Sequence, residues 1–374
     1  MGAAKQHHML QRMSGKNPSE RGDDLRSIVV DPHWFLEDYD PSIRKLRFVH
    51  ADRNTIAATP FLAEGMWDYS RYPQKEVTES ELLGLVPFDA PPPRINFIWH
   101  TAFCCSTLIA STLDREGANV SLKEPGIMLI LADAKRQNAI GQGRPFSHRF
   151  PELVFRLLGR PFRPGAQVTI KPTNFSNYVL RDAASLTQGK HLFLFSDCRS
   201  FVASILKKGE YGRRVAREIY SRIVRDGNEQ AGWPFGEVFH LTDMQIAAVV
   251  WHMQIAEFRR SWPLMAPGRA ASLDCDAFLA KPADTLLAID EFLGLDLGRA
   301  HYESAMESLA NRHSKAASME YSIADRLADH AGIFERFGTE IDAAVRQSYD
   351  LCRSTPRGIP LDNPLVPVEK SYLP

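Results

Sequence analysis

The sequence predicts an α/β fold with a central, mostly parallel sheet flanked by helices. Short apolar or β-branched runs bounded by polar residues are typical of buried parallel strands, and they occur at 95–99 (INFIW), 119–122 (NVSL), 167–170 (QVTI), 191–195 (HLFLF) and 270–273 (AASL). Helical segments separate them at 106–115, 126–138, 176–187, 199–208 and, as a larger block, 211–266. In such folds ligands bind beyond the carboxyl ends of the strands. We therefore expect the functional residues directly after the strands.

The two ends of the chain are predicted to lie outside this α/β domain. Residues 1–25 are polar and aperiodic, as in a disordered tail. Residues 26–93 carry scattered aromatic residues and short apolar runs, which indicate an irregular N-terminal layer packing on the core. The α/β domain is expected to span 94–345, and a proline-rich C-terminal extension covers 346–374.

The composition is that of a globular protein and excludes some classes of binding partner. The chain has 374 residues, 44% hydrophobic and 24% charged, and its 45 basic residues balance 45 acidic ones. This balance argues against nucleic acid or an anionic membrane surface as a partner. The five cysteines show no zinc-binding spacing, and no apolar run resembles a signal peptide or a membrane span. We expect a soluble, cytoplasmic protein without a metal, whose oligomeric state stays open, a homodimer included.

The stretch HTAFCCST, residues 100–107, follows the first predicted strand and leads into a helix. The backbone N–H groups at a helix N-terminus can hold an anion if the side chains are small, as those of Cys104, Cys105, Ser106 and Thr107 are. The stretch lacks the glycines and the lysine of GxxxxGK[ST], which opposes an ordinary ATPase or GTPase. A plain strand-to-helix turn is the alternative interpretation.

Charged side chains follow two other strands. In LKEP, 122–125, Glu124 precedes a proline and should leave the strand extended, where its carboxylate could act as a general base. Lys171 also precedes a proline, and its charge could lie against a transferring group. His100, at the start of the loop, could act on the substrate. The alternatives are an exposed Lys123–Glu124 pair, a solvated lysine and a structural histidine.

The fourth strand is followed by SDCRSFVAS, residues 196–204. Ser196 or Asp197 could cap the next helix. Arg199 and Ser204 would then lie on its first two turns, where Arg199 could have a functional role. Arg199 could equally be a solvated surface arginine.

Taken together, these segments resemble the P-loop-like sulfotransferase superfamily, specifically a bacterial sulfotransferase-like branch. FCCST at 103–107 is similar to RSGTT in the family's PRSGTT loop, and KPT at 171–173 to the KTH that follows a later strand. Ser196 and Ser204 take the positions of the family's arginine and serine.

The resemblance continues downstream. The string SLDCDAFLAKPADTLLAIDEFLGLDL, 272–297, is similar to the family's yEDL, followed by a proline and a helix ending in FLGL. NRHSK, 311–315, resembles the basic segment that closes over the nucleotide's 3'-phosphate. The resemblance covers roughly 94–345.

This resemblance implies a P-loop NTPase-like three-layer fold and a specific reaction. The family transfers a sulfuryl group from 3'-phosphoadenosine 5'-phosphosulfate to a hydroxyl or amine, releasing 3',5'-bisphosphoadenosine, and the scheme requires no metal. The acceptor would be a small molecule, a glycan or a lipid. The resemblance places the nucleotide on the loop, from Phe103 to Thr107, and on Ser196, Ser204, Arg312 and Lys315.

Three family positions are altered. Phe103 stands where the loop normally has a cation, Thr173 where cytosolic enzymes have the histidine base, and Ser196 where an arginine binds the 3'-phosphate. Nearby residues could replace them. The candidates are Lys171 or Lys123 for the cation, Glu124 for the base, and Arg199 with Arg312 and Lys315 for the phosphate. The alternatives to an active enzyme are a non-catalytic nucleotide-binding regulator or scaffold and, third, a small-molecule or nucleotide kinase.

Overall fold

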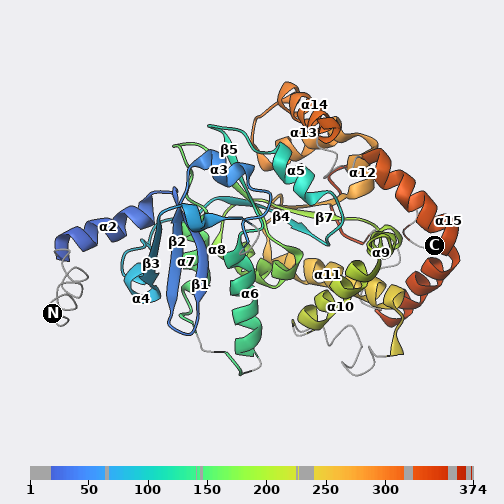
Figure 1. Cartoon of the computed structure of the whole chain (residues 1–374), viewed down its shortest axis with the longest axis horizontal. Coiled ribbons are helices and arrows are strands. Elements are labelled where there is room, and N and C mark those ends of the chain that lie inside the picture. Colours follow the sequence, from blue (N-terminus) through green and yellow to red (C-terminus); the bar gives the residue numbers. More distant parts are fainter. Residues whose placement is uncertain are drawn as a thin grey trace, which may run out of the picture.

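A five-stranded parallel sheet forms the centre of the molecule in a computed structural model (Figure 1). The structure describes residues 18–63, 67–139, 141–143, 146–224, 226, 240–315, 323–352, 360–367 and 372, with side chains for all but 18–23, 308–315 and 323–324. The strands are β4 (Ile95–His100), β5 (Asn119–Lys123), β6 (Gln167–Lys171), β7 (His191–Phe195) and β8 (Ala270–Asp274). Their order is β5-β6-β4-β7-β8, and all neighbours are parallel. The predicted α/β class is confirmed.

Helices cover both faces of this sheet because alternate strand side chains enter two separate hydrophobic clusters. Phe97 and Phe193 point to one face, whereas Ile98 and Leu194 point to the other. The second face carries α5 (Ser106–Thr112), α12 (Cys275–Ala280), α13 (Pro282–Leu293) and α14 (Arg299–Lys315). The first carries α6 (Gly126–Ala139), α7 (Phe150–Leu158), α8 (Leu180–Leu186), α9 (Cys198–Lys207), α10 (Gly209–Ile223) and α11 (Asp243–Ser261). The result is the expected three-layer arrangement (Figure 1).

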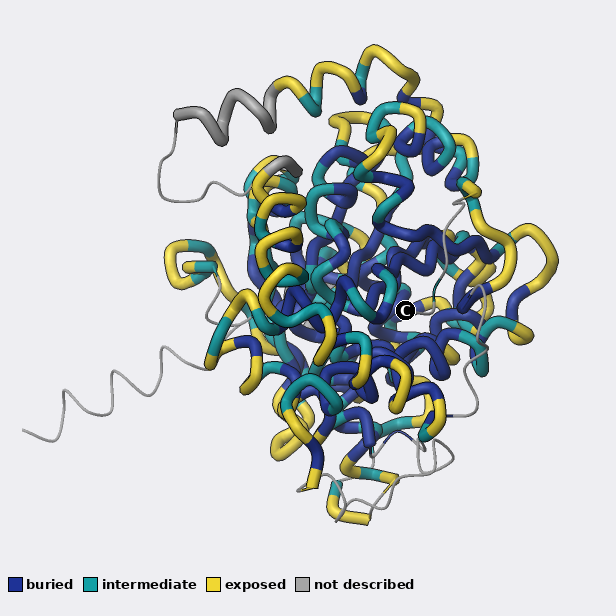
Figure 2. Tube along the Cα trace, turned by 90° about the vertical axis from the view of Figure 1, so that its right-hand side faces the viewer, coloured by how far each residue is buried: buried dark blue, intermediate teal, exposed yellow. Residues whose placement is uncertain are grey.

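Two predicted helical segments differ in detail. The segment expected at 176–187 is a 3-10 helix, η3 (Asn174–Val179), that continues as α8. The block expected at 211–266 divides into α10, α11 and the short η6 (Trp262–Leu264). Every residue of α11 from Ile246 to Phe258 is buried, which makes it the central helix of its layer. Figure 2 shows the buried residues gathered in the interior, with exposed residues on the peripheral helices.

The second face of the sheet is polar on one half and apolar on the other. The register pairs Ser121 with Thr169 and Lys123 with Lys171, so these four side chains point the same way. All four are buried. The half over β7 and β8 carries leucine and alanine instead. The loop that follows β4 therefore leaves the sheet at the boundary between a polar and an apolar half.

The N-terminal layer is a small antiparallel sheet with short helices. It contains α2 (Pro18–Val30), β1 (Trp34–Asp40), β2 (Lys45–His50), α3 (Arg53–Ala58), η2 (Tyr69–Arg71), β3 (Gln74–Thr78) and α4 (Glu79–Leu83). The prediction of a disordered tail is wrong for residues 18–25, because Leu25 and Ile28 of α2 pack into the cluster that contains Phe97. Residues 1–17 lie outside the described part of the chain. The guanidinium of Arg160 donates to the carbonyl of Trp34 (2.6 Å) and joins this layer to α7.

Chain from outside the α/β domain lies along both edge strands of the parallel sheet. At the β5 edge, the Leu62 N–H donates to the Lys123 carbonyl (2.8 Å). At the β8 edge, Ser272 exchanges backbone hydrogen bonds with Asn363 (3.0 Å) and Leu365 (2.7 Å). The last helix, α15 (Ile323–Leu351), runs past residue 345, the predicted end of the domain, and packs on α9 and α11.

Candidate functional site

The loop after β4 lies where the sheet's connections change direction. The chain leaves β4 toward β5 at one edge and leaves β7, the neighbour of β4, toward β8 at the other. Crevices at such switch points, beyond the carboxyl ends of the strands, are where open α/β sheets bind ligands. A ligand site is therefore expected at the loop 100–107, beside the ends of β5, β6 and β7.

The backbone of this loop is left-handed at three residues that are not glycine. The φ angles are +72° at Ala102, +54° at Phe103 and +61° at Cys105. Left-handed backbone disfavours residues with a Cβ by roughly 1–2 kcal/mol each, and such residues concentrate at functional sites. Cys105 is the N-cap of α5, which has only seven residues. A helix this short contributes little on its own, so an anion at the loop needs a nearby cation.

Lys171 is a cation whose side chain reaches the loop from the end of β6. Its ammonium donates to the Glu124 carboxylate and to Thr107 Oγ1 (3.3 Å). The side chain of Lys171 is fully buried, whereas that of Glu124 is 22% exposed. Burial lowers the pKa of Lys171, and the Glu124 charge opposes that shift. The structure thus joins one predicted residue from each of the three segments after β4, β5 and β6.

Glu124 reaches Lys171 through an unexpected backbone conformation. We predicted an extended residue before Pro125, but its φ is +53°, in the left-handed region. Its N–H donates to the Lys171 carbonyl (2.7 Å), which continues the β5–β6 pairing one residue beyond the strand. Lys123, the other predicted source of charge, instead donates to the Ala57 carbonyl in α3. Of the two predicted lysines, Lys171 is therefore the one whose ammonium contacts the loop.

His100 has a structural environment that differs from the catalytic role we expected. Its Nδ1 accepts from the Ala102 N–H (3.1 Å), so its Nε2 carries the proton and donates to the Pro172 carbonyl (2.9 Å). Burial, followed by the charge of Lys171, holds the pKa of His100 well below its usual value. Both ring nitrogens are used within the fold, so this neutral ring orients the loop and is not placed to exchange a proton with a substrate.

Phe103 and Cys104 point away from the candidate anion position, into packed surroundings. The Phe103 ring lies against Phe201 of α9 (5.8 Å between centroids), with the Lys208 ammonium 5.6 Å from its centre. Cys104 is buried, and its thiol donates to the Leu194 carbonyl (3.7 Å). Of the predicted loop residues, Thr107 is the one whose side chain contacts Lys171, while Ser106 is buried at the first turn of α5.

The residues expected at a 3'-phosphate contact α15 instead of an open site. Arg199 donates to Asp342 (2.6 Å) and lies 4.1 Å from the Phe334 ring centre. Ser204 is hydrogen-bonded to His330 (3.0 Å). Asp197 caps α9 through the Ser200 N–H (2.8 Å), as one of the two predicted caps. The side chains of Arg312 and Lys315 lie outside the described residues.

A buried hydroxyl follows each of the two strands at the switch point. Thr101 comes after β4 and Ser196 after β7, and neither hydroxyl has a hydrogen-bond partner in the part of the chain with described side chains. A buried hydroxyl without a partner is costly. The carboxyl edge of the sheet therefore retains polar capacity that a ligand could satisfy.

Sequence reasoning missed two residues of α15 beside the loop. Arg326 is buried, and its positive charge acts on Cys104, Cys105 and His330. Burial lowers the pKa of His330 to about 4, and Arg326 adds to this shift. No local pattern separates a buried arginine in a long helix from a solvated one, so only the packing of α15 on α9 could identify them.

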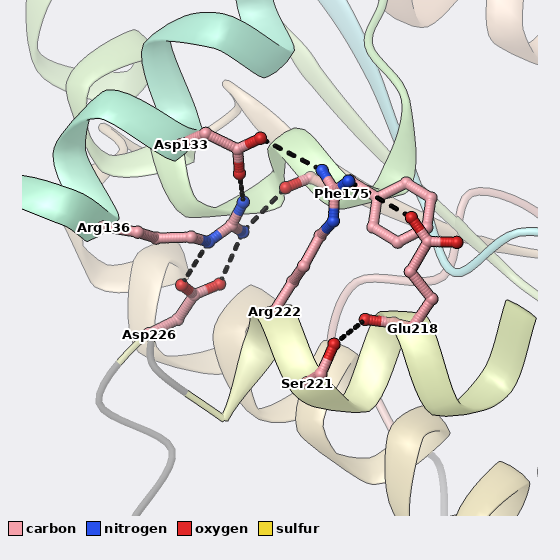
Figure 3. Close-up of polar contacts among 7 residues, drawn as sticks. All are labelled: Asp133, Arg136, Phe175, Glu218, Ser221, Arg222 and Asp226. Atoms are coloured by element: carbon pink, nitrogen blue, oxygen red, sulfur yellow. Dashed lines mark hydrogen bonds and ion pairs between the residues drawn. The ribbon is translucent and has the colours of Figure 1, made fainter.

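A charge network joins α6, η3 and α10 with Asp226 (Figure 3). Arg136 of α6 binds Asp226 through two hydrogen bonds (2.6 and 2.7 Å) and donates to the Phe175 carbonyl of η3 (2.7 Å). Asp133 links Arg136 to Arg222 of α10 (2.9 and 3.0 Å). Burial raises the pKa of Asp226 to about 6, against the effect of Arg136. The network thus joins α6, which follows Glu124 in the chain, to η3, which follows Lys171.

Comparison with known proteins gives a limited match. Neither a family model nor a curated protein matches the chain. Among solved structures, it is similar to the "Sulfotransferase Domain from the Curacin Biosynthetic Pathway", at 15% identity and a TM-score of 0.36, over 67% of this chain and 99% of that one. The assignment of the α/β fold rests on the sheet topology described above.

Two further properties concern the described residues alone. None of their helices combines the length and apolar character that crossing a bilayer requires. Their His, Cys, Asp and Glu side chains form no group of three or more that could hold a metal ion.

Proposed function

We propose that the protein is a sulfotransferase that moves a sulfuryl group from 3'-phosphoadenosine 5'-phosphosulfate to a hydroxyl or amine of an acceptor. The observation that carries the proposal is the buried Lys171 ammonium, held between the Glu124 carboxylate and the Thr107 hydroxyl at the switch-point loop. The resemblance of short motifs within 94–345 to those of sulfotransferases suggests the reaction class. The reaction needs a cation at the leaving phosphate and a base at the acceptor.

In this proposal the Lys171–Glu124 pair supplies both the cation and the base, because binding of the donor separates the two side chains. When the donor's phosphosulfate enters, its negative charge competes with Glu124 for the Lys171 ammonium. Lys171 and Thr107 then donate to the leaving phosphate, and Glu124 is released to accept the acceptor's proton. The bond between sulfur and the phosphate oxygen breaks as the acceptor's oxygen or nitrogen bonds to sulfur. The products are the sulfated acceptor, 3',5'-bisphosphoadenosine and a protonated Glu124.

A second candidate function is non-catalytic binding of the nucleotide on the same fold. It is favoured by the Phe103 ring, which packs on Phe201 where the family loop has a cation. In this case the Lys171–Glu124 ion pair would be structural, and the loop would hold the nucleotide without transferring its sulfuryl group.

Titration separates these functions from a kinase. We expect 3',5'-bisphosphoadenosine to bind the full chain in preference to ATP with magnesium, measured by calorimetry. A preference for ATP with magnesium would overturn both candidates. Incubation with labelled donor and a mixture of hydroxyl and amine acceptors then tests catalysis. A labelled product supports the enzyme, whereas tight binding with no product for any acceptor supports the non-catalytic protein.

A further inference from the structure

A cavity of about 370 Å³ opens at the amino-terminal ends of β5 and β6. Asn119 and Gln167, the first residues of these strands, line it, whereas Lys123 and Lys171 stand at the last positions of the same strands. At the usual rise of a strand, the two ends lie about 13 Å apart. The cavity is therefore a different place from the loop at 100–107, and its volume is that of a small-molecule pocket.

Both the N-terminal layer and the α/β domain contribute walls to this cavity. His33 and Arg53 come from the N-terminal layer, Arg115 from the turn that leads into β5, and Phe162 and Arg163 from the segment between α7 and β6. A junction between two structural units is a common place for a small molecule to bind. These residues come from separate segments of the chain, so no local motif indicated the cavity.

Of the three arginines that line the cavity, two keep N–H groups for a ligand. Arg53 is occupied, because its Nη2 binds the Asp114 carboxylate (2.8 Å) and the Asn119 carbonyl (2.8 Å). Arg115 donates from Nη1 to the Leu297 carbonyl (3.0 Å) and contacts no carboxylate among the residues with described side chains. A guanidinium has five N–H donors in a fork that suits an oxyanion, so Arg115 can hold one.

The carboxylates that line the cavity do not neutralise Arg115. Glu116 accepts from Arg163 Nη2 (3.0 Å), and these two side chains are 60% and 64% exposed. An exposed ion pair contributes little to stability, so a bound anion can take the place of Glu116. Asp52 accepts from the N–H (2.8 Å) and the hydroxyl (2.9 Å) of Thr55 at the start of α3. Arg163 is therefore exchangeable, and the charge of Arg115 is left to attract an anion.

One wall of the cavity is aromatic and apolar. The Phe162 and His33 rings meet edge to face, with 5.2 Å between their centroids. Val120 and Ala166, which have no polar side-chain atoms, also line the cavity. Such a wall favours contact with the apolar or aromatic part of a ligand over contact with water.

We propose that this cavity binds a small molecule that carries one oxyanion, a carboxylate or a phosphate, on an aromatic or apolar body. The oxyanion lies on Arg115 and Arg163, and the body lies against Phe162 and His33. The inference goes beyond the proposed function and does not depend on it, because none of these residues takes part in the proposed transfer.

Calorimetric titration of the full chain with phenyl phosphate and with benzoate tests the proposal. We expect saturable binding of at least one of them, and none of benzyl alcohol, which has the ring without the charge. Arg115→Ala should weaken this binding about tenfold or more, because it removes a charge-assisted hydrogen bond. The matched control is Arg71→Ala, since Arg71 is 83% exposed, pairs with Asp68 (2.9 Å) and does not line the cavity.

Glu116→Gln keeps the proposal testable if Arg115→Ala disturbs the fold. This exposed substitution frees Arg163, so the anionic probe should bind about 1.5-fold to 5-fold more tightly. Asp68→Asn, in the exposed pair outside the cavity, should leave the affinity unchanged. Weaker binding in Glu116→Gln would overturn the proposal, as would equal affinity in wild type and folded Arg115→Ala. Loss of the site in a folded Lys171→Ala variant would also overturn it, by placing the probe at the loop.

Discussion

The two flanks of the loop after β4 are built differently. On the β5–β6 flank, Lys171 and Glu124 form an ion pair that a donor's charge can open, and Glu124 keeps contact with solvent. On the β7–β8 flank, Arg199 and Ser204 are held by Asp342 and His330 of α15. In the proposed function, the first flank supplies the groups that act on the transferring sulfuryl group. The second must release its contacts before it can hold a nucleotide phosphate, so the flanks should respond differently to substitution.

The largest expected effect is at Lys171. Lys171→Ala removes the cation at the loop, and we expect turnover with labelled donor to fall about 100-fold to 1,000-fold, as for loss of a transition-state donor. Binding of 3',5'-bisphosphoadenosine, measured by calorimetry, should weaken as well. The matched control is Lys45→Ala, which breaks the exposed Lys45–Glu76 pair (3.3 Å). Unchanged turnover in Lys171→Ala would show that the β6 flank is not the reacting side.

Glu124→Gln should separate chemistry from binding on the same flank. Glutamine keeps the size of the side chain but cannot accept the acceptor's proton, so turnover should fall about 100-fold. The affinity for 3',5'-bisphosphoadenosine should stay within a few-fold of wild type. Glu76→Gln provides the exposed control. If Glu124→Gln turned over normally, the base would lie elsewhere.

A substitution on the α15 flank should increase the affinity for 3',5'-bisphosphoadenosine. Asp342→Ala frees Arg199 from its partly exposed ion pair, which is worth about 0.2–1 kcal/mol. We expect 3',5'-bisphosphoadenosine to bind about 1.5-fold to 5-fold more tightly in calorimetry. Asp329→Ala is the control, because it breaks the Lys207–Asp329 pair between the same two helices without freeing Arg199. Weaker binding in Asp342→Ala would mean that α15 supports the site as it stands.

The remaining effect is on stability and not on activity, a pH dependence that arises on the α15 flank. The pKa of His330 is lowered from 6.5 to about 4, so the unfolded chain binds the proton more readily between these values. Stability from this group is fully present above about pH 6.5 and is lost as the pH falls toward 4. The urea midpoint of wild type should therefore drop over this range more steeply than that of His330→Gln. Parallel curves for the two proteins would contradict the buried, neutral state of His330.

The parts of the fold and of the candidate site that could be predicted from the sequence are those specified by short stretches of residues. The strands were predictable because runs such as INFIW bury both faces, and their carboxyl ends had to meet at one edge. That argument also brought Glu124 and Lys171 together, although not the left-handed turn that joins them. Helix α2 was missed despite apolar residues at three- and four-residue spacing, Leu25, Ile28 and Val29, because polar residues surround them.

The contacts of α15 could not have been predicted in the same way. Arg326 and His330 lie more than 200 residues after the loop and match no motif. Such contacts follow from how distant elements pack together, and no short-range pattern specifies that packing.

The segments that pair with the two edge strands of the parallel sheet have a consequence for truncation of the protein. Leu62 occupies backbone groups at the β5 edge, and Asn363 and Leu365 occupy those at the β8 edge. A fragment limited to residues 94–345 would lose these segments and leave the Lys123 carbonyl and the Ser272 backbone groups at the two edges open. Uncovered edges of this kind invite strand addition between molecules and aggregation. The segments before and after residues 94–345 are thus expected to protect the edge strands from strand addition.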